Sequence, residues 1–336
     1  MKLASLLPRC WYSGCSLRFL LAPLAALFFL AVVLRRMAYR SGVLMTVILP
    51  VPVIVVGNIT AGGTGKTPLT LKLVEWLREA GYRPGVVSRG YGGRDAGVQA
   101  VVRDSDPAGC GDEPVLIAKR AGCPVWIGRQ RAEAARQMLA NHPEVDVVIA
   151  DDGLQHYALG RDVEVAVVDG KRGFGNGWPL PAGPLREPRS RLDRVDAVVV
   201  NGGVAEVLHM TAPVFAMQLV SAGLRGVRDP LRQARPDDLL GQRVQALAGI
   251  GNPERFFDQL RRLGLDAAPH VFPDHHDYTP SDLPAGTLVM TEKDAVKCAA
   301  FAPDDAWYLM VDAEVEAGLK ELVLDRLKEI HGRKTA

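Results

Sequence analysis

Cysteine is scarce in this sequence, and its scarcity excludes two classes of protein. Only five of the 336 residues are cysteine, and they form neither a Cys-x-x-Cys pair nor another metal-binding spacing. The chain therefore offers neither a zinc module nor a disulfide framework, and we expect reduced thiols, as in a cytosolic protein. Internal repeats are also lacking, which excludes a solenoid. The length suits one large domain or two medium ones.

Acidic residues are missing from the beginning of the chain. Eight basic side chains lie in the first 74 residues, and Glu75 is the first acidic residue. The remainder has 32 basic against 38 acidic residues, so the net charge of +2 conceals an asymmetry. A basic N-terminus on an acidic body favours a surface that faces anionic lipid headgroups, and it argues against nucleic acid as a partner.

One apolar run stands out in the sequence, but it has fewer residues than a typical membrane-spanning helix. Residues 19–34 (FLLAPLAALFFLAVVL) are uncharged and lie between Arg18 and Arg35, whereas a full span needs about 20 apolar residues. A cleaved signal peptide fits poorly, because arginines stand where a small-residue cleavage site belongs. A buried core helix is a second alternative. We favour a membrane helix, spanning or partly inserted, with a cytoplasmic body.

Residues 50–81 have the organisation of a P-loop. β-Branched residues are followed by a glycine-rich loop, by Lys66 and Thr67, and by an apolar pattern of helical period. In this context backbone N–H groups and the helix N-terminus hold phosphate oxygens, Lys66 reaches the β- and γ-phosphates of ATP, and Thr67 binds Mg²⁺. A glycine-rich turn without a ligand is the alternative. The predicted nucleotide-binding residues are Thr60, Ala61, Gly62, Gly63, Thr64, Gly65, Lys66 and Thr67.

Two of the strands that follow end in carboxylates. The apolar run at 146–152 ends in Asp151 and Asp152, as a Walker B strand does, where an aspartate holds Mg²⁺ directly or through water. A rival run at 163–169 ends in Asp169. We prefer the first run because Gln155 and His156 extend its polar tip, although a turn-initiating aspartate is an alternative. Further strands are predicted at 84–88, 124–128 and 195–201.

Polar residues after other predicted elements are further candidates for a site. Tyr91 lies in a loop after the strand at 84–88, at the edge where open α/β sheets build their sites. Asp112 precedes an apolar periodic segment, so an N-cap is the simplest interpretation and catalysis the alternative. The loop at 170–191 is rich in Gly, Pro and Arg, which is typical of a lid or of disorder.

A second, smaller α/β segment follows a polar link at 220–240. Strands are predicted at 244–248 and 287–291, with a helix at 254–263 between them and a terminal helix that ends near residue 330. The glycine loop at 249–253 lacks the third glycine of a dinucleotide motif. Adjacent His275 and His276 lack a third metal ligand, so we expect a proton-handling or hydrogen-bonding histidine.

Seven stretches together resemble the tetraacyldisaccharide 4′-kinases, membrane-associated enzymes that phosphorylate the lipid A precursor. They follow the family's order across almost the whole chain, and the family also carries a threonine where Thr60 departs from the P-loop consensus. The stretches are PVPVIVVGNITAGGTGKTP (50–68), SRGYGG (88–93), GDEP (111–114), DDGLQH (151–156), LPAGPLREP (180–188), FPDHHDY (272–278) and TEKD (291–294).

The resemblance implies an α/β fold in three parts. These are a membrane-associated helix at 1–42, a P-loop NTPase-like core with a mostly parallel sheet at 43–220, and a smaller C-terminal α/β lobe at 221–336. It also implies transfer of the γ-phosphate of ATP, with Mg²⁺, to the 4′-hydroxyl of a lipid A disaccharide 1-phosphate, which forms lipid IVA. The helix would attach the enzyme to the cytoplasmic face of the inner membrane.

The resemblance also suggests roles for individual residues. Asp112, supported by His275, would activate the sugar hydroxyl, and residues so far apart can meet only if the two lobes close. We further expect Lys66 and Arg186 to take part in catalysis. Mg²⁺ would be bound by Thr67, Asp151, Asp152 and Glu187. The substrate would be contacted by Tyr91, Arg131 and His156.

A membrane-bound nucleotide switch is the alternative from another class of protein. Switches with the deviant Walker loop carry a signature lysine just before the Gly-Gly pair, where this chain has Ala61. The sequence therefore favours the kinase.

Overall fold

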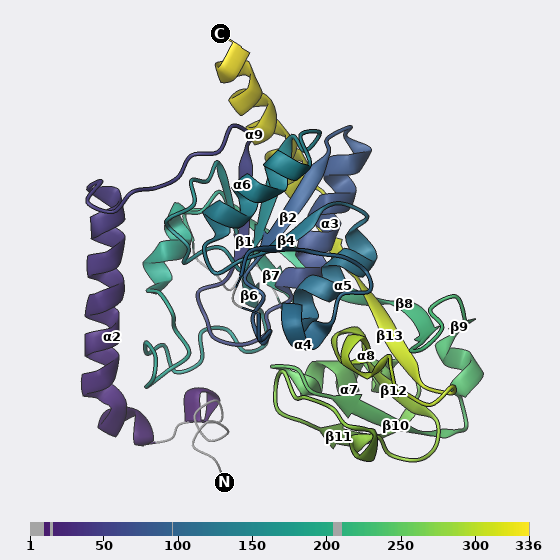
Figure 1. Cartoon of the computed structure of the whole chain (residues 1–336). Helices are drawn as coiled ribbons and strands as arrows, with labels where there is room; N and C mark the ends of the chain where they lie inside the picture. Colours follow the sequence, from purple (N-terminus) through teal and green to yellow (C-terminus); the bar gives the residue numbers. More distant parts are fainter. Residues whose placement is uncertain (1–9, 14–15, 96, 204–209, 336) are drawn as a thin grey trace.

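A computed structural model describes residues 10–13, 16–95, 97–203 and 210–335 (Figure 1). Within these residues one sheet of 13 strands runs through both lobes of the body. The strand order is β11-β10-β12-β13-β8-β7-β6-β1-β5-β2-β4-β3, and β9 pairs with β8. Helices cover the sheet on both faces (Figure 1). This arrangement agrees with the predicted fold class.

The P-loop half of the sheet is parallel except at its far edge. Its strands β1, β2, β4, β5, β6 and β7 pair in parallel, while the edge strand β3 is antiparallel to β4. Their burial on both faces explains why they read as continuous apolar runs. The strands are β1 (Val53–Gly57), β2 (Pro84–Ser88), β3 (Gln99–Val101), β4 (Val125–Ile127), β5 (Val147–Asp151), β6 (Val163–Asp169) and β7 (Ala197–Asn201).

Two apolar layers enclose this half of the sheet. On one face, Leu73, Ile117 and Val323 from three helices share a cluster with Ile54 of β1. On the other face, Met138 packs in a cluster with residues of the loops that follow β5 and β6. The helices are α3 (Lys66–Glu79), α4 (Pro107–Cys110), α5 (Asp112–Ala121), α6 (Arg131–Asn141) and α9 (Gly318–Thr335), and η1 (Arg189–Arg194) is a 3₁₀ turn.

The C-terminal lobe continues the same sheet. Strands β10, β11 and β12 are parallel, and Phe256, Phe257 and Leu260 of α7 pack on them. The elements are β8 (Val214–Gly226), β9 (Gln233–Ala234), β10 (Arg243–Ala248), α7 (Pro253–Arg262), β11 (Asp266–Val271), β12 (Leu288–Thr291), α8 (Glu292–Cys298) and β13 (Trp307–Val315), with 3₁₀ turns η3 (Pro236–Leu239) and η4 (Pro280–Asp282).

Two strands that the sequence analysis missed connect the lobes. β13 lies between α8 and the terminal helix, and it pairs antiparallel with β8 from Trp307 to Val315. β8 extends into the predicted polar link. It was missed because it is only partly buried and has no clean apolar alternation. The expected boundary at 220/221 therefore falls inside β8, and α9 returns to the P-loop half. The division into domains remains a prediction.

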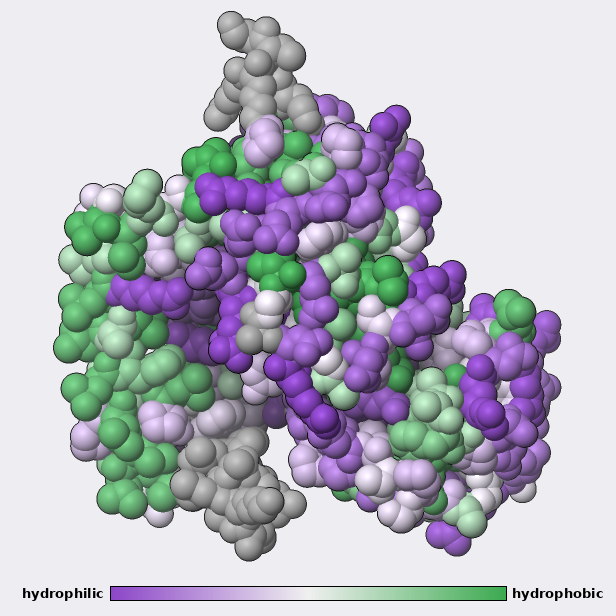
Figure 2. Space-filling model, viewed as in Figure 1, coloured by the Kyte–Doolittle hydropathy of each residue, from purple (hydrophilic) through white to green (hydrophobic). Residues whose placement is uncertain are grey.

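Helix α2 (Leu17–Arg40) stands beside the body and is long and apolar enough to cross a membrane (Figure 1). Ala25 is its only buried residue among those that the structure describes. The alternative of a buried core helix is therefore wrong. The apolar surface of α2 dominates one side of the molecule (Figure 2). Its exposed large apolar residues are Phe19, Leu20, Leu24, Leu27, Phe29, Leu30, Leu34 and Met37.

The packing of α9 on the P-loop half predicts a stability effect. Leu319 is fully buried, so Leu319→Ala should lower the free energy of unfolding by roughly 2–5 kcal/mol because it leaves a cavity. Urea unfolding measures this effect. Exposed Glu321 in the same helix is the control, and Glu321→Ala should change stability by less than about 0.5 kcal/mol. Equal, small effects would show that α9 does not belong to the core.

Candidate active site

The loop between β1 and α3 has the geometry of a phosphate cradle. Gly65, just before α3, has a left-handed backbone with φ of 97°. A Cβ on Gly65 would lie 2.2 Å from Nδ2 of Asn201, which donates a hydrogen bond of 2.8 Å to the Thr64 carbonyl. Glycine is therefore required there by conformation and by space. Asn201, at the tip of β7, is a support for the loop that the sequence analysis did not single out.

This loop lines a cavity of about 660 Å³, which is in the range of ligand sites. Residues 61–67 form one wall, and residues of the C-terminal lobe, among them His275, form another. Phe28 and Val32 of α2 also line the cavity. It therefore joins the phosphate loop, the second lobe and the apolar helix.

Lys66 is held only loosely at the mouth of the cradle. Its Nζ lies 3.5 Å from Oδ1 of Asp152 and 3.5 Å from Oδ1 of Asn58, both longer than a strong charged hydrogen bond. Its side chain lines the cavity and is free to turn toward an incoming phosphate.

Asp151 has the environment of a metal ligand. Its side chain is fully buried at the tip of β5, and Oδ1 accepts a hydrogen bond of 2.9 Å from Thr70. The other oxygen has no hydrogen-bond partner. Burial raises the pKa of Asp151 to about 7. The charge of Lys66 and the hydrogen bond from Thr70 lower the pKa, but they do not compensate for burial. A cation beside the orphaned oxygen would satisfy it, so Asp151 fits the role of a Mg²⁺ ligand, while Thr67 lines the cavity.

Asp152 and Glu187 already have protein partners. Asp152, with φ of 47°, pairs with Arg186 at 3.1 Å and with Lys66. Burial favours its neutral form, but these two cations outweigh burial and hold its pKa far below the usual range. Glu187 accepts hydrogen bonds from Gln155 and from Tyr157. Of the four proposed metal ligands, Asp151 is the one with a buried oxygen that has no hydrogen-bond partner.

Of the three residues proposed for substrate contact, only Tyr91 lines the cavity, and Arg131 and His156 contact each other elsewhere. Tyr91 lines the cavity, and its ring is 4.9 Å from that of His275. Arg131 is buried, its Nε has no partner, and burial lowers its pKa to about 10. Nε2 of His156 accepts a hydrogen bond of 3.2 Å from the Arg131 backbone N–H. Burial and neighbouring arginines lower the His156 pKa to about 4, so its imidazole is neutral.

Asp112 and His275 meet across the two lobes. Nδ1 of His275 lies 3.1 Å from each carboxylate oxygen of Asp112. The N-cap of α5 is Gly111, not Asp112, so the simpler interpretation of Asp112 was wrong. Burial alone would raise the Asp112 pKa, but the hydrogen bond from His275 and the nearby lysines lower it. His276 faces away, with its Nε2 3.5 Å from Asp282.

Lys293 completes this cluster, and the sequence analysis assigned it no role. Its Nζ lies 3.3 Å from Nε2 of His275, 3.1 Å from Glu113 and 3.2 Å from Asp274. Nδ1 of His275 therefore donates to Asp112, while Nε2 accepts from the Lys293 ammonium group. Lys293 belongs to the TEKD stretch, which was the signal for it, but the sequence could not predict that its ammonium group would contact His275.

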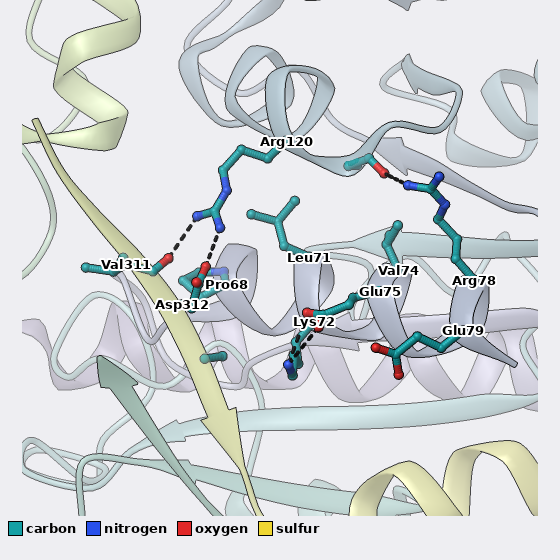
Figure 3. Close-up of a pocket in the computed structure, with 12 residues that line it drawn as sticks. Pro68, Leu71, Lys72, Val74, Glu75, Arg78, Glu79, Arg120, Val311 and Asp312 are labelled. Atoms are coloured by element: carbon teal, nitrogen blue, oxygen red, sulfur yellow. Dashed lines mark hydrogen bonds and ion pairs between the residues drawn. The ribbon is translucent and has the colours of Figure 1, made fainter. Parts of the chain in front are cut away.

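Arg120 joins the two lobes on the other side of the P-loop helix (Figure 3). It lines a second cleft of about 440 Å³ between α3, α5 and β13. Its guanidinium donates to the Val311 carbonyl at 2.8 Å and pairs with Asp312 and with Glu292. Arg120 is in α5, so this contact fixes the helix that begins at Asp112 against β13.

Comparisons with known proteins agree over almost the whole chain. The model of the LpxK family, tetraacyldisaccharide-1-P 4′-kinase, matches residues 17–328. The tetraacyldisaccharide 4′-kinase of Azoarcus sp. (strain BH72) is 53% identical over 98% of this chain and 97% of its own. That of Methylobacillus flagellatus is 49% identical over 96% of both chains.

A solved structure shows the same architecture. The crystal structure of LpxK from Aquifex aeolicus in complex with ATP superposes with a TM-score of 0.78 at 30% identity. The match covers 93% of this chain and 99% of that one. This chain therefore belongs to the tetraacyldisaccharide 4′-kinase family.

Proposed function

We propose that this chain transfers the γ-phosphate of ATP to the 4′-hydroxyl of a lipid A disaccharide 1-phosphate. Family membership supports the reaction, and the comparisons give no support to a nucleotide switch. One observation carries the assignment of the site: the same cavity is lined by the phosphate loop, by His275 and by the apolar helix α2. Nucleotide, proton acceptor and lipid can thus meet in one place.

The P-loop side holds the phosphates. Loop amides and Lys66 bind the β- and γ-phosphate oxygens, and Arg186, already beside Asp152, faces the charge that develops during transfer. Thr67 and Asp151 would hold Mg²⁺, and Asp152 and Glu187 line the same cavity as Thr67. The ion would neutralise phosphate charge when bound.

The Asp112–His275 pair takes the proton from the acceptor hydroxyl. His275 lines both the main cavity and a smaller pocket, whereas Asp112 lines only the smaller pocket of the two. Asp112 orients the imidazole through Nδ1 and stabilises its protonated form. Lys293 must leave Nε2 before that atom can receive a proton. Tyr91 packs against the His275 ring. Arg131 and His156 do not line the cavity, so they need not touch the substrate.

The helix α2 lies in the membrane interface in this proposal, on the cytoplasmic face of the inner membrane. Near its start, Phe19 is 6.2 Å from Trp178 between ring centroids. Near its end, Tyr39 is 6.0 Å from Tyr157. A helix that contacts the polar body at both ends does not cross a bilayer upright. Its outward apolar face enters the leaflet, and the acyl chains of the substrate lie beside it.

Asp112→Asn tests the acceptor chemistry. We expect kcat for transfer of labelled γ-phosphate to a lipid A disaccharide 1-phosphate in detergent to fall by roughly 10²–10⁴, because the amide cannot stabilise a protonated His275. The dissociation constant for ATP should stay within about twofold of the wild-type value, because Asp112 does not contact the P-loop. A near-wild-type rate removes Asp112 from the mechanism. Equal ATP hydrolysis with and without lipid contradicts the kinase assignment.

The pH dependence of stability tests the hydrogen bond itself. Burial lowers the His275 pKa, but the bond to Asp112 outweighs it, so the pKa is raised above the usual value. Stabilisation from protonated His275 is therefore complete below the unfolded-state pKa of about 6.5 and lost as pH rises through the higher folded-state pKa. The stability difference between wild type and His275→Gln, measured by denaturant unfolding, should shrink from about pH 6 to about pH 9. A difference that does not change with pH contradicts this account.

Membrane attachment through α2 is tested with vesicles of phosphatidylglycerol and phosphatidylethanolamine. The double variant Leu27→Glu, Leu30→Glu should bind them at least about tenfold more weakly, because each buried leucine contributes roughly 1.5–3 kcal/mol. Leu231, which is 87% exposed in the C-terminal lobe, gives the control Leu231→Glu, which should not change binding. Co-sedimentation measures both. Equal binding by the two variants means that α2 does not face the lipid.

A further inference from the structure

Asp169 lies at the tip of β6, the strand that was the alternative candidate for the Walker B motif. It has no part in the proposed phosphate transfer. Its side chain is 3% exposed. Oδ1 pairs with Arg255 at 3.0 Å and accepts the backbone N–H of Lys171 and of Arg172. Oδ2 accepts a hydrogen bond of 3.1 Å from Asn252. These donors satisfy the carboxylate, which leaves it no role as a metal ligand.

The side-chain partners of Asp169 come from the other lobe. Asn252 ends the glycine loop 249–252, and Arg255 is in the first turn of α7. A second bond supports this contact, because Arg172, three residues after Asp169, donates to the Gly251 carbonyl at 3.0 Å. The tip of β6 thus holds the beginning of α7 and the loop before it.

The glycine loop lies directly on the P-loop. A Cβ on Gly251 would be 2.8 Å from the backbone nitrogen of Gly63, so the two backbones leave no room for a side chain. Arg255 also donates to the Asn201 carbonyl at 3.4 Å, and the side chain of Asn201 supports Thr64. Contacts therefore run without a break from Asp169 through Arg255 and Asn201 to the phosphate cradle.

These residues face the same cavity as the P-loop. Its lining includes Ile250, Gly251, Asn252 and Arg255 as well as residues 61–67. A guanidinium has five N–H donors, and only part of this fork is used by Asp169 and by the Asn201 carbonyl. The remaining donors suit phosphate oxygens. The positive end of α7 adds to the attraction for an anion.

We propose that residues 250–255 form the second wall of the nucleotide-phosphate site, and that Asp169 is the residue that positions Arg255 in it. Arg255 binds ATP phosphates from the side opposite Lys66, and Asp169 orients the guanidinium without touching the nucleotide. The proposal rests on ATP binding at the P-loop. It also links the nucleotide to the lobe that carries His275, because ATP then stabilises the position of that lobe.

Gly251→Ala tests the wall. The added methyl group must displace the glycine loop from Gly63, so the dissociation constant of a non-hydrolysable ATP analogue, measured by calorimetry on the full chain in detergent, should rise at least about tenfold. Gly97→Ala is the control, since a Cβ there meets nothing within 4 Å. Melting temperatures without nucleotide should match for both variants. Unchanged affinity of a folded Gly251→Ala overturns the proposal.

A double-variant cycle tests whether Asp169 acts through Arg255. Asp169→Asn and Arg255→Met should each raise the KM for ATP about tenfold and leave the KM for the lipid acceptor unchanged. The double variant should be no worse than Arg255→Met alone, because Asp169 has nothing left to position. Additive effects, or an unchanged KM for ATP, overturn the positioning role.

An exposed ion pair between the same two segments is the matched control. Lys171 and Asp258 lie 2.8 Å apart near Asp169, and Lys171→Met should leave the KM for ATP unchanged. An equal rise in this control would mean that any contact between the lobes suffices, which overturns the specific role of Asp169. Calorimetry of the Asp169, Arg255 and Lys171 variants, as for Gly251→Ala, reads ATP binding directly, so these outcomes stand apart from failure of lipid phosphorylation.

Discussion

The hydrogen bond between Nδ1 of His275 and the Asp112 carboxylate is the interaction on which this structure depends, because it joins residues 163 positions apart in the sequence. It exists only while the C-terminal lobe lies against α5. A buried carboxylate is costly unless it is paired, and here Lys293 and Lys297 approach it as well, at 4.0 and 3.6 Å. His275 and both lysines come from the C-terminal lobe, so the base is complete only when the two lobes are together.

Three aspartates at strand tips in one sheet have three different environments, and the environment decides their chemistry. Asp151 is buried with an unsatisfied oxygen, which suits a metal ion. Asp152, its neighbour, is neutralised by Arg186 and Lys66. Asp169 is saturated by donors from its own loop and from the other lobe. Chemical type is therefore a poor guide to role at this edge of the sheet, whereas the partner of each oxygen is a good one.

The position of α2 explains how a soluble nucleotide and an acylated sugar can share one site. The inner face of the helix, with Phe28 and Val32, borders the cavity that begins at the P-loop, while its outer face is apolar and exposed (Figure 2). Lipid chains can remain at that outer face as the polar headgroup enters the cavity. In our proposal α2 lies in the membrane interface and does not span the bilayer, which keeps the lipid chains close to the cavity that receives the headgroup.

The sequence alone determined the elements whose signals are local. Buried parallel strands read as apolar runs, the P-loop follows from glycine spacing before Lys66, and α2 follows from a long uncharged run. The seven family stretches contain most of the candidate site residues, but they did not show which atoms would meet. Strands β13 and β8 were missed because half-buried connecting strands lack a clear period.

Only the tertiary structure decided the pairings. It gave the Asp112–His275 pair, which the resemblance had implied, its atoms and distance, placed Lys293 on Nε2, and left Arg131 and His156 outside the cavity lining. It also gave Asp169 its partners, because Asn252 and Arg255 reach it through a contact between lobes. The physical reason is that secondary structure follows from neighbouring residues, whereas the charge state and role of a buried side chain follow from groups that the fold brings from distant parts of the chain.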